Sequence, residues 1–163
     1  MAVTTQNSTE YAATLATPLV LAGARSNTGK LRTLAFSFNQ SGVGDAGSKI
    51  VLGKLPAGRV KIIGGLSRFF CNIVASSATI DIGNQAYTDT SGAAVAADPD
   101  GMVDGLNVDT VGYFTMEGNT AATKLLGGNH KFDSNDGVII EIKSVAALAN
   151  DDDVAGVITY IVS

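Results

Sequence analysis

The residues best suited to chemistry are four aspartates near the middle of the chain: Asp98, Asp100, Asp104 and Asp109. Clustered carboxylate oxygens are the ligands that Ca²⁺ prefers. An EF-hand loop starting at Asp98 would need an oxygen ligand at its fifth position and glycine at its sixth, but these are Met102 and Val103. The piece Asp98-Pro99-Asp100-Gly101 fits a proline-led β-turn at least as well. We therefore expect no metal site, and we interpret the run Asp151–Asp153 as a solvated turn.

The remaining reactive side chains form no catalytic pattern. His130 has no second histidine or patterned cysteine beside it, as zinc would require, and no Gly-x-Ser-x-Gly elbow supports a triad. We expect His130 to be a surface loop residue. Cys71 lies in the apolar run Phe69–Val74, which predicts a small buried residue rather than a nucleophile.

A glycosidase would need a pair of carboxylates, and such a pair is spatial, so sequence alone does not exclude it. Besides Glu10, however, the only glutamates are Glu117 and Glu141. The alternation of its strand predicts that Glu141 points outward, and the absence of tryptophan leaves few rings for stacking on sugars. We expect no enzyme, no catalytic residue and no cofactor.

Composition limits the classes of partner. The net charge of −4 and the pI near 4.7 argue against a nucleic-acid binder, which needs a basic face. We recognise no signal peptide or membrane span, so we expect no membrane contact and folding in a cytoplasm. Charged residues are only 16% of the chain, against about 25% in typical soluble domains. Either partners cover part of the surface, or the surface is simply rich in Ala, Gly and Ser.

Short alternating apolar runs separated by Gly-rich turns predict an all-β fold. The expected strands are Thr33–Asn39, Lys49–Leu55, Arg59–Leu66 with a bulge at Gly64-Gly65, Phe69–Val74, Thr79–Gly83, Val111–Met116, Val138–Lys143 and Val157–Val162. About seven or eight such strands bury one face each by forming two packed sheets, so we predict a jelly-roll-like β-sandwich, with an open up-and-down barrel as the alternative.

Three other segments lack this alternation. Tyr87–Thr110 is expected to be a long irregular stretch, either functional or packed as a small unit of its own. Thr120–Gly127 fits one helical turn, and Ala146–Asp153 fits a solvated turn. We expect the sandwich to be a single domain spanning residues 31–163.

Residues 1–30 form a separate segment, rich in Thr, Ala and Ser and without a sustained period. We predict an extended N-terminal arm that docks on a neighbouring subunit. The alternative is a first strand added to the edge of the domain's own sheet.

Charge is distributed unevenly along the chain. Arg59–Arg68 contains Arg59, Lys61 and Arg68 and no acid, whereas Asp81–Glu117 contains seven acids and no Lys or Arg. The basic residues are either ordinary outward side chains or partners for Asp98, Asp100 and Asp104 of a neighbouring copy. The second interpretation predicts a homo-oligomer, either a ring such as a trimer or a symmetric dimer.

Four pieces of the chain, together with the terminal strand GVITYIVS (156–163), carry a resemblance to a known group. They are LPAGRVKIIGGLS (55–67), ATIDIG (78–83), AYTDTSGAAVAADPDG (86–101) and MVDGLNVDT (102–110). In these pieces the chain resembles small virion proteins of tailed phages, over most of residues 30–163. The resemblance implies a jelly-roll-like cement or decoration protein on the outside of an icosahedral head. Its partner would be the major capsid protein, and it would be made in the host cytoplasm.

A cement protein works by burying area at several small contacts, so it needs no chemistry. The expected capsid-binding residues of the arm are the apolar anchors Tyr11, Leu15, Leu19 and Leu21 and the cations Arg25, Lys30 and Arg32. The rival interpretations are another virion component, in the tail, neck or head fibre, and a jelly-roll module that binds glycans or a host surface.

Overall fold

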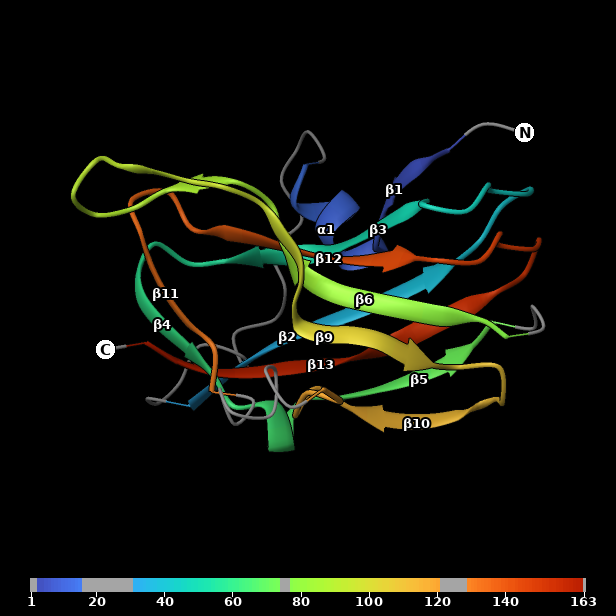
Figure 1. Cartoon of the computed structure of the whole chain (residues 1–163). Helices are drawn as coiled ribbons and strands as arrows, with labels where there is room; N and C mark the ends of the chain where they lie inside the picture. Colours follow the sequence, from blue (N-terminus) through green and yellow to red (C-terminus); the bar gives the residue numbers. More distant parts are fainter. Residues whose placement is uncertain (1–2, 16–30, 74–76, 121–128, 163) are drawn as a thin grey trace.

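The computed structural model describes residues 3–15, 31–73, 77–120 and 129–162, which fold into two β-sheets packed face to face (Figure 1). Eight of the described strands have five or more residues, and five shorter strands extend or flank the sheets. Within the described residues the helical pieces are α1 (Thr9–Thr14) and the 3₁₀ turn η2 (Gly64–Leu66). The predicted all-β, jelly-roll-like sandwich is confirmed.

The first sheet, called sheet A, has the order β1-β3-β12-β6-β9. Its strands are β1 (Thr5–Asn7), β3 (Lys49–Leu55), β12 (Val138–Ser144), β6 (Thr79–Asn84) and β9 (Asp98–Asn107). All neighbours are antiparallel except β1 and β3, and β9 is an edge strand. A register shift between Ile140 and Glu141 marks a bulge in β12.

The second sheet, called sheet B, is organised around the long strand β13 (Asp153–Val162). Along one side β13 pairs with β2 (Leu31–Asn39), and along the other it pairs with β5 (Arg68–Asn72) and then β4 (Gly58–Ile62). Two short outer strands complete the sheet: β10 (Gly112–Thr115) beside β5, and β11 (Lys131–Ser134) beside β4. A separate hairpin of β7 (Tyr87–Thr88) and β8 (Ala94–Val95) projects beyond the sheets (Figure 1).

The core lies between the sheets and consists of the inward residues of alternating strands. In β2, Phe36 and Phe38 are buried as their period of two predicted. In β12, the inward positions expected for Val138, Ile140 and Ile142 are confirmed, because all three are buried. Burying each such side chain contributes about 1.5–3 kcal/mol, so the two inner faces supply most of the stabilising free energy.

Strand boundaries follow the sequence where turns are well marked and depart from it elsewhere. Lys49–Leu55 was predicted with its observed bounds. Gly64-Gly65 forms part of η2 and not a bulge, so β4 ends at Ile62. β13 begins at Asp153 rather than Val157. Its first residues pair with β2 and β5, and these strands are too far from β13 along the chain for a local pattern to predict the pairing. β11 was not predicted.

The stretch from Tyr87 to Thr110 is not irregular as expected. It contains the β7–β8 hairpin and the ten-residue strand β9. The Asp-Pro-Asp-Gly piece starts this strand instead of forming an isolated turn; proline is tolerated because β9 is an edge strand. Gly83 of β6 permits the close pairing, since a Cβ there would lie 1.9 Å from the carbonyl oxygen of Asp98.

The described part of the N-terminal segment lies on the chain's own domain. β1 pairs in parallel with β3, and the backbone N–H of Ser8 donates to the Val51 carbonyl at 2.6 Å. The Ser8 hydroxyl donates to the Leu52 carbonyl and accepts from the Tyr11 N–H, which caps α1. Residues 3–8 thus follow the alternative of a strand added to the sheet edge. Residues 16–30 lie outside the described part, so the extended arm and the domain boundary at residue 31 stay predictions.

The turn at Ala146–Asp153 is less solvated than expected, because Leu148 and Asp152 are buried and Asp152 accepts from the Ala149 N–H at 2.7 Å. The predicted helical turn at Thr120–Gly127 falls almost entirely outside the described residues. None of the helices in the described part has the length and apolarity needed to cross a bilayer.

Candidate functional site

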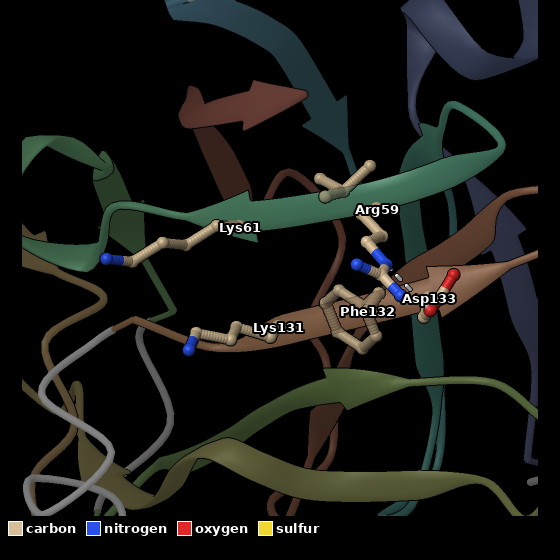
Figure 2. A pocket seen from close by; sticks show the side chains of 6 residues that line it. Arg59, Lys61, Lys131, Phe132 and Asp133 are labelled. Carbon is tan, nitrogen blue, oxygen red and sulfur yellow. Dashed lines mark hydrogen bonds and ion pairs between the residues drawn. The ribbon is translucent and has the colours of Figure 1, made fainter. Parts of the chain in front are cut away.

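The strands β4 and β11 form a shallow groove of about 410 Å³ on the outer face of sheet B (Figure 2). Val60 and Phe132 alternate into the core, so their neighbours share the outer face. Those neighbours are Arg59, Lys61, Lys131 and Asp133. The groove therefore combines three cations and one acid.

The register of the two strands sets the electrostatics of this groove. Arg59 lies opposite Asp133, and their side chains form an ion pair with an Nε–Oδ2 distance of 3.1 Å. Lys61 lies directly opposite Lys131, and Figure 2 shows the two side chains extending in the same direction. Like charges at opposite positions of an antiparallel pair repel, so this end of the groove favours an anionic partner.

The structure brings together only part of the predicted basic set. Arg59 and Lys61 share the groove, whereas Arg68 lies on β5, opposite Val157 and Thr115. Lys131 was missed because β11 is only four residues long. Its alternation, Lys131-Phe132-Asp133-Ser134, was the available signal.

The predicted acidic set lies on the edge strand β9, where Asp98, Asp100 and Asp104 are exposed. Asp98 hydrogen-bonds Asp100, and the pKa of Asp98 is raised first by partial burial and then by this neighbour. Among the described residues, no three His, Cys, Asp or Glu side chains are grouped so that they could hold a metal ion.

His130 is not a fully exposed loop residue as expected. It is half-buried, its ring packs 4.7 Å from that of Phe132, and Asp98 lies near enough to interact with it electrostatically. Burial lowers the pKa of His130, with the Asp98 carboxyl partly offsetting this effect. The beginnings of β9 and β11 therefore adjoin at one side of the sandwich.

The outward orientation expected for Glu141 did not imply exposure. Glu141 is 0% exposed, its Oε1 is 2.5 Å from the Lys49 Nζ, and its Oε2 accepts from Gln85 at 2.7 Å. The expected burial of Cys71 is confirmed, and burial raises the pKa of its thiol to about 12, which leaves it unreactive.

Two of the predicted arm anchors lie at a second groove, of about 540 Å³, between α1, β2 and β3. Tyr11 is half-buried there, and Leu15 is 59% exposed. Arg32 lies on β2 beside Tyr160. The other predicted arm residues, Leu19, Leu21, Arg25 and Lys30, lie outside the described residues.

No known family model and no curated protein matches this sequence. Solved structures do. A chain of the capsid of Ralstonia phage GP4 superposes with a TM-score of 0.64 and 14% identity, over 100% of this chain and 99% of that one. The fold is that of a chain found in phage capsids. A chain from the capsid asymmetric unit of cyanophage Pam1 matches with a TM-score of 0.52 and 12% identity, over 88% of this chain and 93% of that one.

At these identities the likeness concerns the fold. Both matches extend over nearly the whole of both chains, so the sandwich is compared with chains of similar length. The expectation of a phage capsid-related protein with a β fold, stated from the sequence, agrees with this comparison.

Proposed function

We propose that this chain is a structural protein of a phage virion, and specifically a cement or decoration protein on the outer surface of the head. The observation that carries the proposal is the whole-chain likeness to a chain of the Ralstonia phage GP4 capsid. Because 99% of that chain is covered, the match is to a separate protein of this size and not to one domain of a longer shell protein.

Lattice stabilisation requires binding and not catalysis. Repeated copies on a symmetric shell make weak contacts effective through multivalency. The described residues offer two grooves for such contacts. Two of the reactive side chains are engaged otherwise, because Cys71 is buried and Glu141 is ion-paired. The major capsid protein is the proposed partner, and neither a nucleic acid nor a membrane is part of the proposal.

The arm remains the proposed contact with the shell. Tyr11 and Leu15 lie at the α1 groove, just before the segment that holds the other apolar anchors, Leu19 and Leu21. An extended apolar segment can add main-chain pairing to the edge of a partner's sheet. The cations Arg25, Lys30 and Arg32 would pair with acids on the lattice.

The two rivals make different demands. A tail or neck component would share the fold but not bind heads, whereas a head-fibre component would bind heads and would be separated from a cement protein by its copy number. A module for glycans or host surfaces needs aromatic rings around a concave site. Within the described residues the β4–β11 groove has only the buried ring of Phe132, and the α1 groove has only the half-buried ring of Tyr11. This arrangement favours the cement role.

The deciding experiment is co-sedimentation of the purified chain with empty, undecorated phage heads, with its copy number measured against the capsid protein. Saturable binding at a fixed low-integer ratio is expected. Absence of binding would overturn the cement proposal. It would favour a tail or neck component, or a glycan-binding module, instead.

The arm is tested in the same assay with point variants. A deletion of residues 1–24 would also remove β1 and α1 from β3, so it would change the domain itself. The double variant Leu19→Ser/Leu21→Ser should lose at least about tenfold in head affinity. The control is Val43→Ser, another exposed apolar residue, which should bind normally. Equal binding by both variants would refute the arm's role.

A further inference from the structure

The outer faces of the two sheets differ in how their charges are satisfied. On sheet A, Glu141 is bonded to Lys49 and Gln85, and Lys143 lies 3.8 Å from Asp81. These two ion pairs satisfy four charges within the face. Sheet B instead leaves apolar side chains and two neighbouring lysines toward solvent.

An apolar patch crosses the outer face of sheet B from the edge strand β10 to β2. Tyr113 is 83% exposed, and its ring lies 5.4 Å from that of Phe70, its cross-strand partner. Phe70 lies opposite Ala155, and the neighbouring pair is Val157 with Ala35. The solvent face of an antiparallel sheet is normally polar, and a contiguous apolar patch marks an interaction surface.

The outer face as a whole is large enough for a protein partner. Its four strands, at a spacing of about 4.8 Å over the length of β13, make a platform of roughly 600 Å², of which the apolar patch is one part. Specific interfaces bury about 800 Å² per partner, so this face with its rim approaches that size.

Three cations lie on this face. Arg68 lies within the patch, opposite Val157, whereas Lys61 and Lys131 form a basic rim at the β4–β11 end, directly opposite one another. Neither lysine has an ion pair among the described residues. A bound carboxylate would relieve their mutual repulsion.

The chain itself carries the complementary surface. No Lys or Arg interrupts the seven acids of Asp81–Glu117, and three of these acids are exposed on the edge strand β9. Asp98 lies near His130, next to Lys131, so the acidic edge and the basic rim adjoin on one side of the molecule. A two-fold axis beside this side would set the acids of each copy against the lysines of the other.

We propose that the outer face of sheet B binds a second copy of this chain. Phe70, Tyr113 and Val157 contribute the apolar patch, and Lys61 and Lys131 receive the β9 carboxylates of the neighbouring copy. This self-association goes beyond the proposed capsid role and does not depend on it.

The test measures mass against protein concentration by sedimentation equilibrium, at low and high salt. Wild type should associate at low salt and dissociate as salt rises. Lys61→Glu/Lys131→Glu and Asp100→Lys/Asp104→Lys should each weaken association at least about tenfold, and an equimolar mixture of the two should restore it. Lys54→Glu is the matched control for Lys131→Glu, because it reverses the charge of an exposed lysine on sheet A. It should leave self-association unchanged.

A monomeric wild type at high concentration and low salt would overturn the proposal, as would association that both double variants leave unchanged. Tyr113→Asp provides a second test, because its exposed ring contributes little to folding; it should also dissociate the oligomer. Circular dichroism confirms that each variant is folded. If these variants lose head binding but still self-associate, the outer face of sheet B contacts the shell and the self-association proposal is wrong. If the wild type self-associates but does not bind heads, the self-association proposal holds and only the capsid role is refuted.

Discussion

The buried carboxylate of Glu141 gives the sharpest prediction about stability. It is 0% exposed and is held by the Lys49 ammonium at 2.5 Å and the Gln85 amide at 2.7 Å. Replacing Lys49 by Met leaves a buried charge with one neutral donor. Breaking a fully buried ion pair costs about 3–5 kcal/mol. Because the Lys49 side chain is 35% exposed and Gln85 remains, we expect a loss of about 2–3 kcal/mol.

The physical argument requires the two residues to be coupled. Glu141→Gln removes the charge but keeps an acceptor for Lys49, so it should cost about 1–2 kcal/mol. In the double variant Lys49→Met/Glu141→Gln no charge is buried without a partner. Its loss should fall short of the sum of the single losses by about 1–2 kcal/mol.

The assay is urea unfolding at neutral pH, with the free energy of unfolding extrapolated to water. The matched control is Lys143→Met, because Lys143 is 38% exposed and 3.8 Å from Asp81. That contact is longer than the Lys49–Glu141 pair, and Asp81, although buried, also accepts from the Gly105 N–H at 2.9 Å, so Lys143→Met should cost only about 1 kcal/mol. Equal losses for Lys49→Met and Lys143→Met, or strictly additive losses in the double variant, would refute the assignment of Glu141 as a desolvated charge.

Three further predictions concern backbone contact, thiol access and pH. Gly83→Ala should lower the free energy of unfolding by about 3 kcal/mol or more, because its Cβ would lie 1.9 Å from the Asp98 carbonyl oxygen. The control Gly112→Ala, whose Cβ would have its nearest atom at 3.8 Å, should change stability by less than about 1 kcal/mol. Similar melting points for the two variants would contradict the close approach at Gly83. Cys71 should not react with a thiol reagent in the native protein but should react fully in urea, because it is buried and its pKa is about 12; rapid native labelling would show that it is accessible. Burial lowers the pKa of His130 from 6.5, so the unfolded chain takes up a proton more readily than the folded chain. Stability should therefore fall as the pH drops below about 6.5. His130→Gln should remove this dependence, and an unchanged pH profile would assign it to another group.

Much of the fold could be predicted because local patterns and the final structure agree. The period of two in Thr33–Asn39 and Val138–Lys143 identifies their inward residues, and Pro56-Ala57-Gly58 ends β3 where expected. The apolar run around Cys71 correctly indicated a buried strand. Strand β9 was missed because its Pro and Gly residues indicate a turn, and only pairing with β6 holds them in a strand.

The candidate site was predictable only in part. Arg59 and Lys61 could be identified from the basic run, but the pairing of Lys61 with Lys131 joins residues 70 positions apart. Likewise, alternation correctly pointed Glu141 away from the core, while its burial depends on Lys49 and Gln85 from other strands. The residues of the arm beyond Leu15 remain predictions from the sequence.

The sequence by itself determined the class of fold, because hydrophobic alternation and turn residues act within a few positions along the chain. It also determined the separation of acidic from basic segments. Only the tertiary structure decided which charges meet, which are buried and which apolar residues share the outer face of sheet B. Strand order and register depend on pairing between distant segments, and a shift of one residue would turn every side chain to the opposite face.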